Sequence, residues 1–454
     1  MKKIFKLIWL AMFFSNVAVA QNQQQRLDSL FTEMNNKKAF NGNVLIAADG
    51  KVIFEKSYGL ADNRKNIKLT DKSIFNLASI TKQFTAAAIL LLQGENKLSL
   101  ADDITRYFPE LFFYKGITID HLIHHTSGLP DYMELMQQKA DRKKAVTNKY
   151  VIQVLAKEKP ALHFSPNDRF EYSNTGYLLL ASIIEKISQT SYRTYLKQNI
   201  FLPLDMHSTD VFFLYKDKMT VSDVAIGYIE PDVGEDFTSD VPYVRYFDGA
   251  YGQGRIYSTA QDLLKWAQAL HDHTLFTEEE THVITDNFRL HNNQFTNYGF
   301  GVYLSDSKKY GKVMNHSGSW GGYTTFLEQH PANDIVIIFL QNHSLITTKI
   351  PIQQVRKILY NEPLVADKPV ELKSAELDKY VGYYTNSDIH MKVLITKKDD
   401  VLYLQANDQT AIPLQYFGKH AFKFEPDDIA LIFNLEKETF ELSQGRLQFV
   451  FIRE

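Results

Sequence analysis

A serine and a lysine three residues apart stand where the chain enters its first long helical pattern. From about Ser79 to Asn96 the apolar residues recur with helical spacing, and Ser79 is followed by Lys82. Residues three apart share a helix face, so we expect the Lys82 amine within reach of the Ser79 hydroxyl. A lysine in a desolvated cleft loses its proton near neutral pH and can act as a base, and the helix N-terminus favours developing negative charge. The pair therefore predicts a serine nucleophile and its base.

The same spacing recurs at Ser305 and Lys308, where no apolar helical pattern follows. We interpret that second copy as a solvated turn. The spacing alone is a weak signal, and other chemistry-bearing residues have to support it.

A second set of reactive types is Tyr172, Ser173 and Asn174, between a turn at residues 166–168 and a helical pattern that begins near Gly176. A tyrosine held near the nucleophile can relay a proton, and an asparagine amide can hold a substrate carbonyl. A similar tripeptide occurs at residues 384–386, so only its position relative to Ser79 gives this one meaning.

A third set is His316, Ser317 and Gly318, followed by Ser319, Trp320 and a pair of glycines. We expect an edge strand here, with small residues that allow close backbone approach. The Ser319 amide, together with that of Ser79, is then a candidate oxyanion hole. Trp320 is a candidate wall of the substrate cleft, although such aromatic residues are more often core.

The elements around these sets predict a sheet closed by both ends of one domain. Strand patterns at residues 44–48 and 52–58 flank Asp49-Gly50, a strong hairpin signal, and strands are expected at 318–328 and 335–341. Amphipathic helices are expected near residues 27–34, 150–156, 176–188 and 260–270. We therefore expect an α/β (α+β) sandwich, with a central antiparallel sheet flanked by helices.

The chain divides into four predicted segments. Residues 1–20 carry Lys2, Lys3 and Lys6, an apolar run and Ala18-Val19-Ala20, which is typical of a signal peptide; the run is short for a membrane anchor, so no stable span is expected after cleavage. Residues 21–362 form the catalytic domain, the polar, proline-containing residues 363–375 a linker, and the alternating residues 376–454 a small all-β barrel. The protein is then periplasmic or secreted.

Composition excludes several classes of function. The chain has no cysteine, so a disulfide, a thiol nucleophile and a thiolate metal site are all excluded. Loss of the leader would change the formal charge from −3 to −6, which argues against a nucleic-acid partner. His121, His124 and His125 have helical spacing, but no nearby acid completes a site, and we expect no metal and no cofactor.

The three sets in this order resemble the active-site signature of the serine β-lactamase and penicillin-binding protein superfamily. Further stretches are similar to its class C related branch: LIHHTSGLPDY at 122–132, Tyr257-Ser258-Thr259 with Asp262-Leu263, and Tyr298-Gly299-Phe300-Gly301. The resemblance covers about residues 25 to 360. Residues from about Leu377 look like the lipocalin-like barrel that several relatives carry.

This resemblance implies a role for each matching residue. Ser79 would be the acylated nucleophile, Lys82 its base and Tyr172 the proton relay, while Asn174 would bind the substrate amide. His316 would lie on the substrate-binding strand with Gly318, Ser319 and Trp320, at the position where the family pattern has a lysine. A titratable histidine weakens recognition of a substrate carboxylate at neutral pH.

The resemblance thus favours a peptidase or esterase that acts on D-amino-acid peptides, cell-wall peptides or esters, so the expected partner is a small-molecule or peptide substrate. A β-lactamase is the alternative within the enzymes. A non-catalytic penicillin-binding or ligand-binding protein of the same fold is the alternative outside them, although such a protein would not need Ser79, Lys82 and Tyr172 together.

Overall fold

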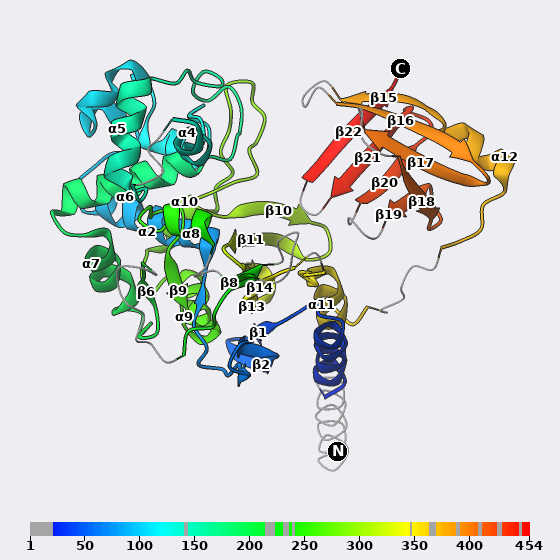
Figure 1. Ribbon diagram of the computed structural model, residues 1–454, viewed down its shortest axis with the longest axis horizontal. Coiled ribbons are helices and arrows are strands. Elements are labelled where there is room, and N and C mark those ends of the chain that lie inside the picture. Colours follow the sequence, from blue (N-terminus) through cyan, green and yellow to red (C-terminus); the bar gives the residue numbers. More distant parts are fainter. Residues whose placement is uncertain are drawn as a thin grey trace, which may run out of the picture. The chain divides into compact units, whose positions relative to one another are not determined.

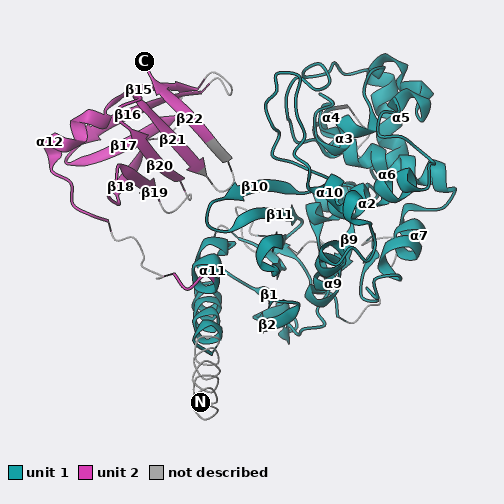
Figure 2. Ribbon diagram, turned by 180° about the vertical axis from the view of Figure 1, so that it is seen from behind, with its two compact units in different colours: residues 1–359 teal, residues 360–454 magenta. Residues whose placement is uncertain are grey.

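The computed structural model describes two compact units, Met1–Leu359 and Tyr360–Glu454 (Figures 1 and 2). The described residues are 21–139, 144–213, 223–229, 236–237, 241–345, 347–362, 369–386, 391–406, 411–424, 429–444 and 447–454. The predicted signal peptide, and residues 363–368 of the predicted linker, lie outside them. Within the described residues, none of the helices combines the length and apolar character that crossing a bilayer requires.

The first unit is built on a six-stranded antiparallel sheet that both ends of the unit supply. Its order is β10-β11-β12-β13-β1-β2, as the strand patterns at the two ends predict. The strands are β1 (Gly42–Ala48), β2 (Lys51–Tyr58), β10 (Tyr303–Ser307), β11 (Gly311–Trp320), β12 (Tyr323–His330) and β13 (Ile335–Gln341). The β1–β2 turn places Asp49 and Gly50 at positive φ, which is the geometry that an Asp-Gly hairpin requires.

Helices cover both faces of this sheet. Val44 and Ile46 of β1 point to the face covered by the helix of residues 21–36 and by α11 (Ile352–Leu359), whereas Leu45 and Ala47 join the larger core on the opposite face. Alternate residues of a strand point to opposite faces, so each strand serves both cores. The predicted sandwich is confirmed.

The larger core contains most of the helices, which Figure 1 shows gathered on one side of the sheet. They are α2 (Thr81–Gly94), α3 (Ile119–Ile123), α4 (Tyr132–Lys139), α5 (Asn148–Glu158), α6 (Asn174–Ser188), α7 (Tyr192–Leu196), α8 (Pro242–Tyr246), α9 (Ala260–His271) and α10 (Glu278–Thr285). A short sheet, β5 (Phe75–Asn76), β9 (Ile256–Ser258) and β6 (Asp210–Val211), leads into the turn that precedes α2.

The strand expected over residues 318–328 is in fact a hairpin, so that prediction is wrong. β11 ends at Trp320, β12 begins at Tyr323, and the two pair antiparallel across Gly321 and Gly322. Both glycines have positive φ, at 53° and 87°, a conformation that lets the chain reverse in two residues.

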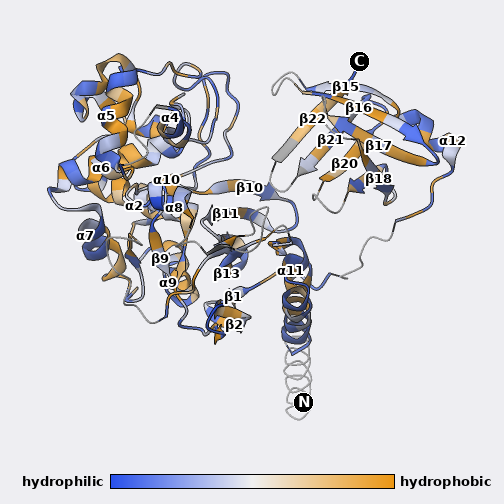
Figure 3. Cartoon of the chain, viewed as in Figure 1, coloured by the Kyte–Doolittle hydropathy of each residue, from blue (hydrophilic) through white to orange (hydrophobic). Residues whose placement is uncertain are grey.

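The second unit is a closed eight-stranded barrel, as expected for the C-terminal residues. Its strands are β15 (Gly382–Asn386), β16 (Met391–Lys398), β17 (Val401–Ala406), β18 (Ile412–Tyr416), β19 (Ala421–Phe424), β20 (Ile429–Asn434), β21 (Thr439–Gln444) and β22 (Leu447–Arg453), preceded by α12 (Ser374–Leu377). Apolar and polar residues are mixed along these strands (Figure 3). The rings of Phe433 and Phe440 fill the interior against Tyr380, Tyr384 and Phe422.

Candidate active site

Ser79 lies in η1 (Ala78–Ile80), a short 3-10 turn directly before α2. The preceding Ala78 has φ 48°, a left-handed conformation that costs a non-glycine residue about 1 kcal/mol. Two contacts hold this turn: Asn76 Oδ1 accepts a hydrogen bond from the Ala78 N–H at 2.8 Å, and the Thr325 hydroxyl of β12 donates to the Leu77 carbonyl at 2.8 Å. The half-buried Ser79 is therefore fixed against the sheet.

Lys82, one turn into the helical segment, is fully buried. Its Nζ lies 3.3 Å from Ser79 Oγ, 2.9 Å from Asn174 Oδ1 and 3.1 Å from the Gln253 carbonyl oxygen. Burial lowers the pKa of Lys82 to about 7, while the nearby Asp131 carboxylate acts in the opposite direction. The predicted pair is thus brought together, with an amine that titrates near neutrality.

The second predicted set reaches the same point from α6. Asn174 is the first residue of that helix, and the ring centroid of the half-buried Tyr172 lies 4.7 Å from Lys82 Nζ. The ring centroid of Tyr177, one turn after Asn174 in α6, lies 5.5 Å from the same Lys82 Nζ. The structure therefore gathers Ser79, Lys82, Tyr172 and Asn174 around one nitrogen atom.

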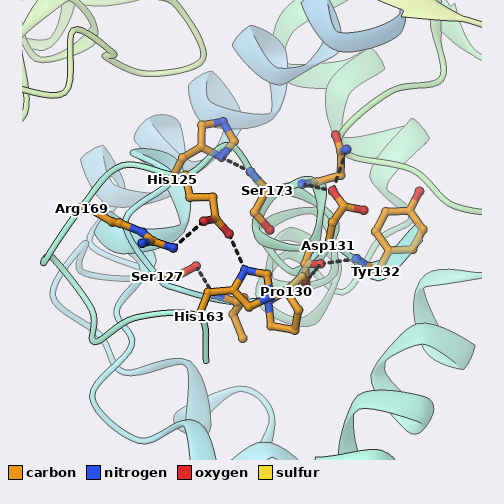
Figure 4. Close-up of polar contacts among 12 residues, drawn as sticks. His125, Ser127, Pro130, Asp131, Tyr132, His163, Arg169 and Ser173 are labelled. Atoms are coloured by element: carbon orange, nitrogen blue, oxygen red, sulfur yellow. Dashed lines mark hydrogen bonds and ion pairs between the residues drawn. The ribbon is translucent and has the colours of Figure 1, made fainter. Parts of the chain in front are cut away.

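The loop of residues 125–132 holds this second set in place (Figure 4). The Ser173 N–H donates to His125 Nδ1 at 3.1 Å, and the Glu171 N–H donates to the His125 carbonyl at 2.9 Å. Asp131 Oδ2 accepts from both the backbone N–H and the side-chain amide of Asn174, at 3.0 and 2.9 Å. Glu171, Ser173 and Asn174 are thereby tied to this loop by hydrogen bonds.

His125 itself is buried beneath the tyrosines. Its ring centroid lies 4.3 Å from that of Tyr172 and 4.8 Å from that of Tyr298. Burial, together with the positive charge of Lys82, holds the pKa of His125 well below its usual range. The imidazole is therefore neutral, and because Nδ1 accepts from Ser173 its proton is on Nε2.

His316 is on β11 as predicted, but it is buried and bonded to its surroundings. Its Nδ1 lies 2.6 Å from the Ser317 carbonyl, and its Nε2 lies 3.2 Å from the Tyr298 hydroxyl. Because a carbonyl only accepts, Nδ1 carries a proton. The ring centroids of His316 and Tyr172 are 6.1 Å apart. His316 therefore contacts the residues around Lys82 Nζ through the ring of Tyr172.

Gly318 makes the close approach that the sequence predicts. A Cβ at this position would lie 2.2 Å from the Leu77 carbonyl oxygen and 2.9 Å from Ala78 Cβ, so only glycine lets β11 contact the turn that carries Ser79. β10 pairs with β11 only as far as Asn315, and no strand of the described residues covers that edge from His316 onward. The exposed Ser319 lies on this uncovered edge.

Trp320, at the end of β11, belongs to an aromatic cluster with Tyr243 and Phe247. Its ring lies 5.6 Å from that of Tyr243 and 6.2 Å from that of Phe247, and the Arg255 guanidinium lies 5.6 Å from it. Arg255 is buried and pairs with Asp248 at 3.2 Å. The contacts of Trp320 therefore lie with this cluster, whereas Ser79, Lys82, Tyr172 and Asn174 converge directly.

Two residues of this arrangement, Asp131 and Gln253, were not predicted from the sequence. Gln253 contributes its backbone carbonyl, which no side-chain pattern reveals, although the neighbouring Gly252 is closely packed, with a Cβ there only 2.4 Å from the Tyr177 carbonyl oxygen. Asp131 lies in the stretch 122–132, which resembled the family pattern but suggested no role for its acid.

The histidines weighed as metal ligands have other partners. His124 Nδ1 lies 3.0 Å from Asp120 Oδ1, and its ring stacks on Phe288 with centroids 4.3 Å apart. In the described part of the chain, no three histidine, aspartate or glutamate side chains gather as metal ligands would.

Comparison with known proteins gives consistent matches. The Beta-lactamase family model matches residues 27–347. Penicillin-binding protein 4* of Bacillus subtilis (strain 168) is 34% identical over 407 residues, which cover 87% of this chain and 90% of that protein. The octameric penicillin-binding protein homologue from Pyrococcus abyssi has a TM-score of 0.66 at 24% identity, covering 94% of this chain and 99% of that one.

The D-amino acid amidase from Ochrobactrum anthropi SV3 has a TM-score of 0.62 at 23% identity, covering 76% of this chain and 99% of that one. At these identities the two solved structures establish a shared fold. Family membership follows from the model that matches most of the chain and from the relative that is similar along nearly its whole length. The chain belongs to the β-lactamase family, within the serine β-lactamase and penicillin-binding protein superfamily of serine hydrolases.

Proposed function

We propose that this protein is an exported serine hydrolase that forms an acyl-enzyme through Ser79 and acts on D-amino-acid peptides, cell-wall peptides or esters. One observation carries the proposal. The buried Lys82 amine, whose pKa is lowered to about 7, lies 3.3 Å from Ser79 Oγ. A base with that pKa is half deprotonated at neutral pH, which is the condition for efficient proton transfer.

The partners of Lys82 support its role as the base. A neutral amine has two N–H donors and one lone pair. Two oxygens, Asn174 Oδ1 and the Gln253 carbonyl oxygen, can only accept hydrogen bonds, so each accepts one of the two N–H groups. The lone pair is then directed to the Ser79 hydroxyl, from which it removes the proton.

The remaining steps follow the same geometry. Ser79 Oγ attacks a substrate carbonyl, and the backbone N–H groups of Ser79 and Ser319 stabilise the oxyanion. Tyr172, whose ring faces Lys82, relays the proton from Lys82 to the leaving group, and water then attacks the acyl-enzyme, which releases the acid and returns a proton to Ser79. We propose that Asn174, besides its hydrogen bond to Lys82, also binds the amide of the substrate.

The contacts of His316 support a substrate without a free carboxylate at this position. The Ser317 carbonyl lies 2.6 Å from Nδ1 and the Tyr298 hydroxyl lies 3.2 Å from Nε2, so both ring nitrogens of the buried His316 already have partners and neither is left for a substrate carboxylate. This favours amides and esters over β-lactams, whose carboxylate needs a cation. The D-amino acid amidase among the structural relatives is in keeping with an amide substrate.

Export is proposed from the sequence alone, through the leader of residues 1–20. Its cleavage would release the mature protein to the periplasm or the medium. The N-terminal sequence of the protein isolated from its host tests this: a mature chain that begins at about Gln21 is expected, and one that retains Lys2, Lys3 and Lys6 would contradict it.

The nucleophile is tested by intact mass after exposure to a fluorophosphonate. One phosphonyl adduct is expected on the wild type and on Ser305→Ala, and none on Ser79→Ala. Ser305 is a matched control because it is an exposed serine three residues before a lysine. A folded wild type that gains no mass would reject Ser79 as the nucleophile and favour a binding protein.

Substrate class is tested separately with a D-amino acid amide, a short-chain ester and a penicillin. Turnover of the amide or the ester with no penicillin adduct is the expected result. Rapid hydrolysis of the penicillin by wild type, absent in Ser79→Ala, would instead establish the β-lactamase alternative.

A further inference from the structure

The amide of Asn174 faces Lys82 with its oxygen, and the reason lies on its other side. Asn174 Nδ2 donates to Asp131 Oδ2 at 2.9 Å, and the backbone N–H of the same residue donates to the same oxygen at 3.0 Å. A carboxylate only accepts, so it selects the NH₂ end of the amide and leaves Oδ1 for Lys82. Asp131 thereby decides the direction of the Asn174 amide.

The reversed amide would disable the base. With its NH₂ group toward Lys82, Asn174 would require an acceptor, and the acceptor of a neutral amine is its lone pair. That lone pair would then be withdrawn from Ser79 Oγ, which lies 3.3 Å from the amine. The direction of one amide therefore separates a usable base from a sequestered one.

We propose that Asp131 is a positioning residue that, by fixing the Asn174 amide, keeps the Lys82 lone pair directed at Ser79. This inference rests on the proposed function and adds to it a residue that touches neither Ser79 nor the Lys82 amine by a hydrogen bond. Asp131 is itself held, because its Oδ1 accepts from the Met133 N–H at 2.8 Å at the start of α4. Figure 4 shows Asp131 between Pro130 and Tyr132 in this contact network.

Neighbouring bonds fix the backbone on both sides of the contact. The Thr175 hydroxyl donates to the Pro130 carbonyl at 2.7 Å and accepts from the Tyr132 N–H at 2.7 Å. The 130–132 segment and the first turn of α6 are therefore joined independently of the Asp131 carboxylate. Removal of that carboxylate is expected to change the amide while leaving the two segments together.

The charge of Asp131 gives the role a measurable signature. The titratable groups that face Lys82 are Asp131 before α4, His125 after α3, Tyr172 before α6 and Tyr177 within it. Burial keeps His125 and Tyr177 neutral, since it lowers the pKa of the first and raises that of the second. Asp131 is the carboxylate of this set, and it favours the charged form of Lys82.

The test is the rate of fluorophosphonate labelling of full-length Asp131→Asn, measured from about pH 5 to about pH 9. The plateau is expected to fall roughly tenfold to a hundredfold, because asparagine has one acceptor oxygen where the carboxylate has two, so it cannot accept from both Met133 and Asn174 and no longer fixes the direction of the Asn174 amide. The acid limb is expected to move to lower pH, because the remaining amine has lost the carboxylate that favours its proton. A purely structural residue would not move that limb.

A matched control is Asp103→Asn. Asp103 also accepts two backbone N–H groups, from Thr105 at 2.8 Å and Gly116 at 2.6 Å, but it caps η2 (Ile104–Arg106). Asp103→Asn is expected to lower the thermal stability, while the plateau and the acid limb of its labelling profile stay as in wild type. If Asp131→Asn does not fold, Asp131→Ser retains a hydroxyl that can cap α4 and carries the same expectations.

The Asn174→Ala background decides whether Asp131 acts through the amide. There, Asp131→Asn is expected to cause less than about a twofold further loss of plateau rate. A full loss in that background, or a wild-type plateau and limb for Asp131→Asn alone, would overturn the positioning role while Ser79 stayed labelled. A wild type that is unlabelled at every pH would overturn the proposed function, and the positioning role with it.

Discussion

The two units of this protein bury different kinds of side chain. The first buries a lysine, an arginine, several histidines and carboxylates and many amides and hydroxyls, some of them at α2, the 125–132 loop and the start of α6. In the described residues of the second unit the buried side chains are apolar or aromatic, with Asn386 as the polar exception. Burial of unpaired polar groups costs stability, so a protein retains it where chemistry requires it.

The costs in the first unit are specific. Lys82 is fully buried, Ala78 adopts a left-handed conformation, and the buried His125 Nε2 has no hydrogen-bond partner among the described residues. The interior of the barrel is aromatic instead. Phe433 alone contacts the rings of Tyr380, Tyr384, Phe422 and Phe440. A filled aromatic interior stabilises the fold and offers no reactive group.

The largest expected effect comes from Lys82→Met. Methionine has a similar length but no amine, so it removes the proposed base while filling most of the same volume. The rate of fluorophosphonate labelling at pH 7 is expected to fall by roughly 10² to 10⁴. A rate within about threefold of wild type would contradict the role of Lys82.

The same variant isolates the cost of the buried amine. The folded-state pKa of about 7 is below the value of 10.5 for a free lysine side chain, so the unfolded chain binds more protons between these values. The free energy of unfolding of wild type, relative to Lys82→Met, is therefore expected to rise as the pH increases from 7 toward 10, and to be flat below 7. Urea unfolding of both proteins at several pH values measures the difference.

Phe433→Ala tests the other half of the comparison. Loss of this buried ring is expected to lower the free energy of unfolding of the barrel by about 3–5 kcal/mol, with the labelling rate of Ser79 unchanged. Ile432→Ala on the same strand is the control, because Ile432 is 54% exposed and its loss should cost less than about 0.5 kcal/mol. Calorimetry with parallel labelling separates the two readouts, and a labelling rate that fell with barrel stability would show that the barrel contributes to the chemistry.

The division between predicted and missed features follows the same physical difference. Side-chain type and spacing identified Ser79 with Lys82, and the Asp49-Gly50 turn identified the first hairpin. Gln253 was missed because it acts through a backbone carbonyl, and Asp131 because its effect depends on which end of an amide it contacts. Such contacts join segments more than forty residues apart, and no local pattern encodes them.

The hairpin at β11–β12 was missed for a local reason. The sequence pattern places the glycine pair within a strand as small residues, whereas positive φ at both makes it the turn. The distinction matters for the proposed site, because β11 ends at this turn and its Gly318 lies in close contact with Leu77 and Ala78, directly before Ser79.

Gly318→Ala sharpens this point with a smaller expected effect. The added methyl would meet the Leu77 carbonyl and Ala78, so β11 must move away from the turn that carries Ser79. The free energy of unfolding is expected to fall by about 1–3 kcal/mol. The labelling rate should fall, while the acid limb of its pH profile, which reports the pKa of Lys82, should stay nearly in place. Gly311→Ala on the same strand is the control, since its Cβ would have its nearest neighbour at 3.5 Å, although its φ of 71° adds some strain. Equal labelling by both variants would contradict the close approach.

Among the changes at the Ser79 site, the smallest effect on labelling is expected for Tyr172→Phe. The ring that faces Lys82 is retained, and only the hydroxyl is lost. Fluoride leaves a fluorophosphonate without needing a proton, so the labelling rate should stay within about threefold of wild type. An amine leaving group does need one, so hydrolysis of an amide substrate is expected to fall by roughly 10² to 10⁴. Equal losses with both would mean that the hydroxyl positions Lys82, and that leaving-group protonation comes from another group.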